Sequence, residues 1–372
     1  MIRTAPKRAA GTAAIAAMLS TISAMASAAD FSESPAEPVA YPYVEGAGEI
    51  TIGDDFVVSS DDSAGEVNDL FFEGELGLKV FLTPLAAINV GITAESVEDP
   101  APFEDRAFGD IGLYVDTLNL ELSNGTTTFL AGKFGAGFGT AWDVTPGVYK
   151  TDFAEDYELS EQIGFGLSHA FATGFGTHTL GANVFTADTS VLSESAFTNR
   201  GRLSRFDGGA GNTGRLDNFS VTLDGSDMPG FDGVSYHLGY RHLSSFGDDH
   251  DENGFVAGLA RETELANGMT LGINGEAAYL HNAFGSAHDA LYLTSGMSLQ
   301  NGPWHGELAG TIRRLDFGDG SDQSDLLAQV SAGYAFDNGF DVSLGYVYAR
   351  ADEIEAHVVG LRLTKEFEFT TR

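Results

Sequence analysis

Apolar and polar residues alternate along most of the chain with a period of two, which predicts β-strands with one apolar and one polar face. The last such stretch carries Val359, Leu361, Leu363, Phe367 and Phe369 on one face, and Gly360, Arg362, Thr364, Glu366 and Glu368 on the other. Alternation changes parity once, between Val115 and Leu118. This change predicts a β-bulge near Asp116.

Sixteen alternating stretches can be counted, and strand numbers between fourteen and eighteen fit the pattern. They begin near Glu49, Asn68, Leu85, Gly109, Thr126, Glu158, Phe175, Leu216, Gly233, Asn253, Met269, His288, Pro303, Asp322, Phe340 and Ile354. The mean spacing of roughly 21 residues accommodates a membrane-spanning strand of about 9–11 residues together with half a turn and half a loop.

The connections between these stretches alternate between short and long. Short turns include Thr83-Pro84, Ser123-Asn124-Gly125, Ala172-Thr173-Gly174, Asn267-Gly268, Asn301-Gly302 and Asp337-Asn338-Gly339. Several contain Asn-Gly, the pair that favours tight hairpins. Residues 97–108, 139–157, 186–215 and 318–323 form longer, acidic connections. We therefore predict an all-β fold: a transmembrane antiparallel β-barrel with short periplasmic turns and long extracellular loops.

A closed barrel satisfies every backbone hydrogen bond in hydrocarbon, and a barrel of this size encloses a wet lumen behind its polar face. Aromatic residues beside the short turns are typical of an interfacial girdle. These aromatics are Phe171, Phe175, Phe231, Trp304, Phe336, Phe340 and Phe369. The alternative is a soluble β-sandwich or β-solenoid that buries the same apolar faces as its core.

Composition narrows the function. The chain has 54 Asp and Glu against 19 Lys and Arg, a net charge of −35, and this argues against nucleic acid as a partner. It contains no cysteine, which excludes disulfides, a thiol nucleophile and Cys-ligated metals. Beyond the N-terminus, no stretch approaches the ~18–20 consecutive apolar residues of a membrane helix.

The N-terminus has the pattern of a secretory signal peptide. Arg3, Lys7 and Arg8 precede a small-apolar run, and Ala26-Ser27-Ala28 provides a cleavage site. We expect residues 1–28 to be the signal peptide, residues 29–48 an extended lead-in, and residues 49–372 the outer-membrane barrel.

With these features the chain resembles the Gram-negative general porin family over essentially the whole mature sequence. The resemblance implies an outer-membrane location among lipid, a water-filled channel for passive diffusion of small hydrophilic solutes and ions, and a homotrimer. It also implies that the third long loop, residues 139–157, folds inward and narrows the pore. Phe367 and Phe369 correspond to the terminal aromatic signal for the assembly machinery, although porins of this type usually end on the aromatic residue and Thr370-Thr371-Arg372 follow here.

The candidate constriction consists of charged residues on that loop and on the polar faces of the strands. The loop supplies Asp143, Lys150, Asp152, Glu155 and Asp156, and the wall supplies Arg241, Arg313 and Arg362. An acidic loop opposite basic wall residues implies a transverse electric field. Further inward carboxylates are Glu73, Glu75, Glu276, Glu307, Asp325 and Glu366. Because they outnumber the inward cations, we expect the pore to prefer cations.

Other functions stay open. Trp142, Tyr149 and Phe153 keep open a substrate-selective channel for a sugar or metal chelate, and a closed structural barrel or adhesin is a further alternative. The chain lacks G-x-S-x-G and H-E-x-x-H motifs, so we expect neither an enzyme nor a bound cofactor. Asp316, Asp319, Asp322 and Asp325 offer oxygen ligands for Ca²⁺, although an acidic surface loop explains them better.

Overall fold

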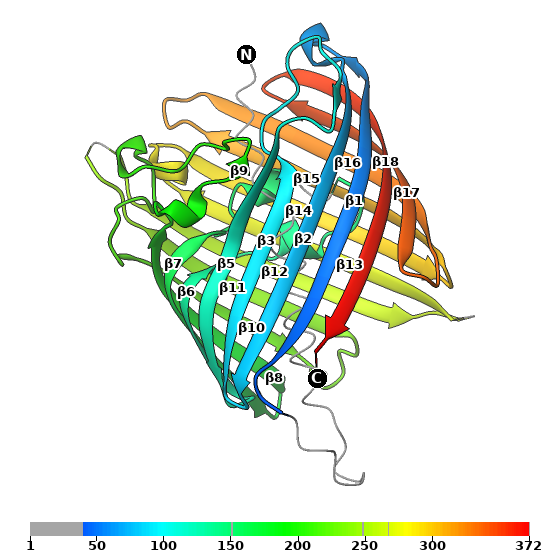
Figure 1. Ribbon diagram of the computed structural model, residues 1–372. Coiled ribbons are helices and arrows are strands. Elements are labelled where there is room, and N and C mark those ends of the chain that lie inside the picture. The colour runs from blue at the N-terminus through cyan, green and yellow to red at the C-terminus, as the bar shows by residue number, and fades with distance from the viewer. Residues whose placement is uncertain (1–39, 150–151, 248, 267, 372) are drawn as a thin grey trace.

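Sixteen long antiparallel strands form a closed β-barrel in the computed structural model, which describes residues 40–149, 152–247, 249–266 and 268–371 (Figure 1). The barrel strands are β1 (Tyr43–Ser60), β2 (Asn68–Thr83), β3 (Ala86–Ser96), β5 (Ile111–Ser123), β6 (Thr127–Phe134), β7 (Gln162–Thr173), β8 (Gly176–Ala187), β10 (Asn218–Ser226), β11 (Val234–Leu243), β12 (Glu252–Glu264), β13 (Met269–His281), β14 (Asp289–Asn301), β15 (Trp304–Asp316), β16 (Asp322–Ala335), β17 (Phe340–Ala351) and β18 (Ile354–Thr370). The predicted signal peptide lies outside the described residues.

The predicted strand starts agree with the structure to within a few residues, with one marked exception. β1 begins at Tyr43 instead of near Glu49, so the end of the expected lead-in belongs to the barrel. The prediction was wrong because Gly46, Ala47 and Gly48 show no contrast between the two faces of the strand.

The barrel closes where the first and last strands meet. β1 pairs with β18 from Glu45–Thr370 to Ser60–Ala356, and the amide of Thr371 donates to the carbonyl of Val44 at 3.0 Å. Closure removes the unpaired sheet edge, which hydrocarbon does not tolerate. The same pairing places Phe367 and Phe369 opposite Gly48 and Gly46 on the outer face.

The two faces of the strands have the polarity of a membrane barrel. Outward residues such as Leu259 and Leu344 are more than half exposed, whereas the inward Glu276 and Asp325 are almost completely buried. A soluble sandwich would bury the apolar face instead, so this alternative is wrong. The predicted bulge is confirmed, because the register between β3 and β5 shifts at Asp116.

The aromatic residues beside the short turns are all exposed on the barrel surface, as a membrane-interface girdle requires. Trp304, Tyr334 and Phe336 form a chain of edge-to-face contacts there, with ring centroids 4.8 Å apart in each pair. No helix in the described parts of the chain is long and apolar enough to cross a membrane.

Long loops are concentrated in the first half of the barrel. Residues 97–110, 135–161 and 188–217 connect strands at one rim, while residues 317–321 and 352–353 are the last connections at that rim. The expected long loop at 318–323 is therefore short. Asp352 and Glu353 both have positive φ, as in the tight turns that join twisted strands.

The loop 188–217, which we call the sealing loop, completes the barrel wall. β6 ends at Phe134 and β7 begins at Gln162, so the upper part of β5 has no neighbour from these strands. Two short strands occur in the long loops, β4 (Arg106–Ala107) and β9 (Ala196–Phe197). β9 lies in the sealing loop and pairs with Gly112 and Leu113 of β5, next to the top of β5 in Figure 1.

Buried ion pairs attach the sealing loop to the wall. The Nζ of Lys133 lies 2.7 Å from Glu161 and 2.8 Å from Asp188, and Arg200 lies 2.5 Å from Glu161. The Arg200 guanidinium also covers the ring of Tyr114 at 3.5 Å. Burial alone would raise the pKa of Asp188, but hydrogen bonds from Lys133 and Ser190 hold this pKa below its ordinary value. Asp188 therefore stays charged at neutral pH.

Replacing Lys133 tests this attachment. We expect Lys133→Met to leave the carboxylates of Glu161 and Asp188 without their buried cation and to destabilise the barrel by about 3–5 kcal/mol. The exposed pair of Arg202 and Glu194 in the same loop provides a matched control, and Arg202→Gln should cost less than ~1 kcal/mol. Denaturant unfolding in detergent micelles measures both values, and equal losses would contradict a sealing role for Lys133.

Candidate pore constriction

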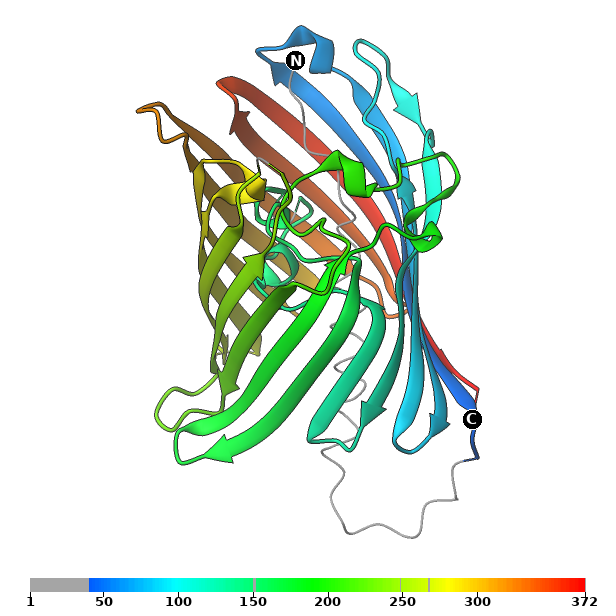
Figure 2. The ribbon, with the colours of Figure 1, turned by 90° about the vertical axis from the view of Figure 1, so that its left-hand side faces the viewer.

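The loop from 135 to 161, which we call the inner loop, runs inside the barrel over its described residues, 135–149 and 152–161 (Figure 2). The loop leaves the wall after Phe134, contains the short helices α2 (Ala141–Val144) and α3 (Asp152–Glu155), and rejoins the wall at Gln162. It forms polar contacts with inward-facing residues of β11, β13, β15, β16 and β18.

Apolar packing holds the inner loop against one side of the lumen. The loop contributes Ala136, Phe138, Ala141, Phe153, Ala154, Tyr157 and Leu159 to a buried cluster, and the wall contributes Phe185, Leu243, Val256, Ala278, Leu280, Ala290, Tyr292, Leu327 and Val347. This cluster of the described residues resembles the core of a soluble protein. One side of the lumen is therefore filled by packing between the loop and the wall, and the other side stays open.

Glu276 on β13 is the main polar attachment of the inner loop. One carboxylate oxygen accepts hydrogen bonds from the amide and hydroxyl of Thr140, both at 2.8 Å. The other accepts from the amide of Ala141 at 3.1 Å and from the Tyr157 hydroxyl at 2.7 Å. Burial and the adjacent Glu276 carboxylate raise the pKa of Tyr157 well above its ordinary value, so its hydroxyl remains a donor.

Further polar contacts continue along the wall. The two nitrogens of His237 face the carbonyl of Phe138 and, at 2.7 Å, the carboxylate of Asp224. Asn274 donates to the hydroxyl of Thr145 at 2.8 Å. Gln329 on β16 accepts from the amide of Tyr149 at 3.0 Å.

Inward-facing glycines give the inner loop the space to approach the wall. They are Gly239, Gly254, Gly296, Gly345 and Gly360. A Cβ on Gly239 would overlap the carbonyl oxygen of Phe138, and a Cβ on Gly345 would overlap the side chain of Val148. A methyl group at either position would therefore push the loop away from its seat.

The three predicted wall arginines each contact a carboxylate and the inner loop. Arg313 lies 2.8 Å from Asp156 of the loop and 2.7 Å from Asp325 of β16. Its guanidinium also covers the ring of Phe153 at 4.4 Å.

Arg241 and Arg362 are held in the same manner. Arg241 lies 2.7 Å from Glu252 and donates to the backbone carbonyl of Tyr157 at 2.5 Å. Arg362 pairs with Asp55 at 2.8 Å, and its guanidinium contacts the rings of Phe71 and Tyr149.

These contacts correct the expectation of a transverse field. Asp156 and Arg313 are in direct contact instead of facing each other across an open gap, because the loop packs against the part of the wall that carries Arg313. Opposite charges at this distance form a short dipole, whose field falls off faster than that of separated charges.

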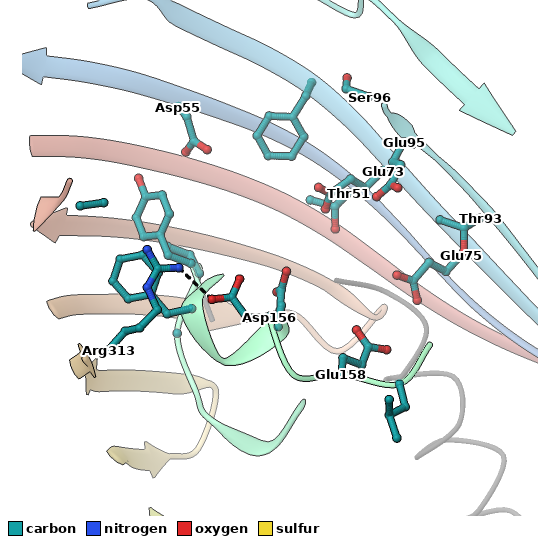
Figure 3. Close-up of a pocket in the computed structure, with 18 of the residues that line it drawn as sticks. Thr51, Asp55, Glu73, Glu75, Thr93, Glu95, Ser96, Asp156, Glu158 and Arg313 are labelled. Carbon is teal, nitrogen blue, oxygen red and sulfur yellow. Dashed lines mark hydrogen bonds and ion pairs between the residues drawn. The ribbon is translucent and has the colours of Figure 1, made fainter. Parts of the chain in front are cut away.

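The opposite side of the lumen is acidic. A cavity of about 900 Å³ lies between the inner loop and the strands β1 to β3. Its wall carries Glu49, Asp55, Glu73, Glu75 and Glu95, which we call the acidic bank. Figure 3 shows Glu73, Glu75 and Glu95 on these strands, with Asp156 and Glu158 of the inner loop across the cavity.

Carboxylates exceed cations around this cavity. Twelve Asp and Glu residues and four arginines line it among the described residues. Each arginine lies within 2.8 Å of a carboxylate oxygen. The four ion pairs are Arg106–Asp69, Arg241–Glu252, Arg313–Asp156 and Arg362–Asp55. The lining therefore has a strong negative excess after every one of these pairs is formed.

The remaining predicted residues lie in different surroundings. Glu73, Glu75, Glu155, Asp156 and Glu307 line the cavity, and Glu307 also contacts His305 and Ser331. Asp143 lies on α2 and is not part of the cavity lining, while Glu366 faces inward opposite Glu49. Lys150 and the side chain of Asp152 lie outside the described residues.

The aspartates with a spacing of three do not assemble a Ca²⁺ site. Asp325 points inward to Arg313, whereas the exposed Asp319 accepts hydrogen bonds from Ser321 in its own turn. In the described parts of the chain, no group of three or more His, Asp or Glu is placed to hold a metal ion.

The cavity also contains carboxylates that the sequence analysis did not select. Asp55, Glu95 and Glu158 all line it. The parity of β1 and β3 contains a signal for the first two, because Asp55 shares a face with Thr51, and Glu95 with Thr93. Glu158 lies on the loop, where alternation gives no information.

Comparison with solved structures shows the fold. The outer-membrane channel DcaP of Acinetobacter baumannii superposes with a TM-score of 0.57 and 12% identity, covering 88% of this chain and 99% of that one. OpdK of Pseudomonas aeruginosa, solved with vanillate, superposes with a TM-score of 0.51 and 11% identity, covering 88% of this chain and 99% of that one. OmpT of Vibrio cholerae in its trimer form superposes with a TM-score of 0.52 and 10% identity, covering 87% of this chain and 99% of that one.

No family model and no curated protein matches the sequence. The similarity therefore lies in the barrel architecture, which is that of the Gram-negative outer-membrane porins. Together with the outward-facing apolar surface, it gives the chain the fold of a transmembrane β-barrel.

A methyl group at Gly239 tests the seat of the inner loop. We expect Gly239→Ala to displace Phe138 and change the single-channel conductance, because the added carbon would lie 2.4 Å from the backbone oxygen of Phe138. Gly306→Ala is the control, since its Cβ would meet only an ordinary contact 3.7 Å from the carbonyl of Ser331. Planar-bilayer recordings compare the two variants, and identical conductance for both would contradict a tight seat.

Proposed function

We propose that the protein is an outer-membrane channel for passive diffusion of small hydrophilic solutes, and that it favours cations. The observation that carries this proposal is the acidic bank opposite the inner loop, with every arginine of the cavity already paired to a carboxylate. The outer-membrane channel architecture of DcaP supports the same function.

Electrostatics explains the direction of the preference. A low-dielectric wall lined by charges of one sign raises the local concentration of the opposite ion. The paired arginines contribute dipoles, whereas Glu73 lies on the open side of the cavity and forms no ion pair among the described residues. The Debye length shortens from about 10 Å at 0.1 M salt to about 3 Å at 1 M, so the wall charges are screened more strongly. The cation preference should therefore weaken at high salt.

A substrate-selective channel is the second candidate. Phe71, Tyr149, Phe153 and Phe284 line the cavity and offer ring faces to an organic solute. The OpdK structure was solved with the aromatic acid vanillate. The acidic lining here disfavours an anion of that kind, so a selective version of this channel would take a neutral or cationic solute. A closed barrel would give no conductance at all.

Removing one charge from the acidic bank tests the cation preference. We expect Glu73→Gln to reduce the ratio of cation to anion permeability while leaving the channel open, because the substitution keeps the side-chain size and removes the charge. The measurement is the reversal potential in a KCl gradient across a planar bilayer. Asp319→Asn, in the exposed turn 317–321, is the control and should leave the reversal potential unchanged.

A wild-type reversal potential that favours chloride would overturn the cation preference. Conductance that saturates with one solute would favour the selective channel. No conductance from the folded barrel would contradict both channel proposals.

We also propose that the channel assembles as a homotrimer, as OmpT does in its trimer form. Native mass spectrometry of the detergent-extracted protein should give a mass three times that of the mature chain. A single-chain mass in every mild detergent tested would contradict this assembly.

A further inference from the structure

We propose that Glu276 sets the size of the pore by holding both limbs of the inner loop, separately from the charges that set ion preference. This inference rests on the proposed channel function and assigns a positioning role to a residue that the sequence analysis placed among the acidic wall residues. Glu276 does not line the main cavity, from which the inner loop separates it.

The four hydrogen bonds to Glu276 come from both ends of the loop. Thr140 and Ala141 belong to the outgoing limb, where α2 begins, and Tyr157 belongs to the returning limb after α3. One side chain therefore ties together two segments that are separated by the loop tip. The position between the limbs is also tight, because a Cβ on Gly139 would overlap the Tyr157 ring.

Within the loop, the amide of Ala136 donates to the carbonyl of Leu159 and joins the limbs at the point where they leave the wall. The other hydrogen bonds cited above from wall side chains to the loop do not duplicate the connection made by Glu276. His237 contacts the outgoing limb through Phe138. Arg241 donates to the carbonyl of Tyr157 on the returning limb, and its guanidinium also lies 4.6 Å from the centroid of the Phe138 ring on the outgoing limb, without a hydrogen bond there. Gln329 and Arg313 hold the loop tip and α3 region at Tyr149 and Asp156. Among these polar contacts, Glu276 is the one that bonds to both limbs.

The amide of glutamine cannot reproduce the bonding of this carboxylate. Each oxygen of Glu276 accepts from one backbone N–H and one hydroxyl. A glutamine NH₂ group only donates, so it would face a backbone N–H in either orientation. A hydroxyl can rotate to accept, but a backbone N–H cannot. Glu276→Gln therefore breaks at least one attachment while preserving the shape of the side chain.

The experiment compares Glu276→Gln with Glu121→Gln in the full-length protein. Glu121 on β5 is also an inward carboxylate; it accepts from Lys79 at 2.8 Å and from Asn89 at 3.0 Å, and none of its described contacts is with the inner loop. Both variants remove one inward charge and one set of wall hydrogen bonds. A purely structural contribution to barrel stability therefore affects both variants.

We expect Glu276→Gln to admit larger neutral polyethylene glycols in liposome swelling and to replace a single conductance level by fluctuating levels. Its reversal potential in a KCl gradient should stay close to that of the wild type. Glu121→Gln should keep the wild-type size limit. Tyr157→Phe removes one of the four bonds and should produce a smaller change of the same kind, and the double variant should be less than additive because both changes act through one attachment.

An unchanged size limit and conductance for Glu276→Gln, in a wild-type channel that conducts, would overturn this inference without affecting the proposed function. A changed reversal potential with an unchanged size limit would also overturn it and make Glu276 a selectivity residue. An equal change for Glu121→Gln would assign the effect to general barrel stability. A wild-type barrel that does not conduct would instead contradict the proposed function itself.

Discussion

The fold depends on one constraint: in hydrocarbon, every backbone N–H and C=O of the wall needs a partner within the protein. Pairing of β1 with β18 satisfies this requirement around the barrel. The inner loop creates a local exception, since β6 stops at Phe134 when the chain turns into the lumen. β9 then pairs with the upper part of β5, and ion pairs of the buried Lys133 and Asp188 and of the half-buried Arg200 hold the sealing loop in place. The inner loop that narrows the lumen therefore requires the sealing loop to complete the wall.

The position of the inner loop also determines which charges a solute meets. The loop packs against the half of the barrel that carries Arg241 and Arg313, and both arginines are bound to it or to a neighbouring carboxylate. The opposite half, formed by β1 to β3, keeps its carboxylates on the open side of the cavity. Size and charge thus depend on different parts of the molecule, with Glu276 on the covered side and Glu73 on the open side.

Alternation predicted the strands well because a barrel between lipid and water imposes opposite polarity on successive residues. Alternation predicted the first residue of β2, β13, β16, β17 and β18 correctly, and it predicted the bulge at Asp116. It misplaced the start of β1, where Gly46 and Gly48 carry no polarity. Parity also identified inward charges such as Arg313, but their partners could not be read from the sequence. The bond between Arg313 and Asp156 joins strand and loop residues far apart in the chain, and only the path of the inner loop brings them together.

The sealing loop has two halves with different freedom to change. Residues 188–200 contain β9 and the ion-paired Asp188 and Arg200, so a substitution there would disturb the attachment of the loop to the wall. Beyond them, Phe206 is almost fully exposed near a single turn of 3₁₀ helix, Arg205–Asp207. Evolution can therefore vary the exposed tip at Phe206 without opening the wall, whereas the neighbouring Gly208–Asn212 line the cavity and are more constrained. The same tip is a suitable place to insert an epitope tag.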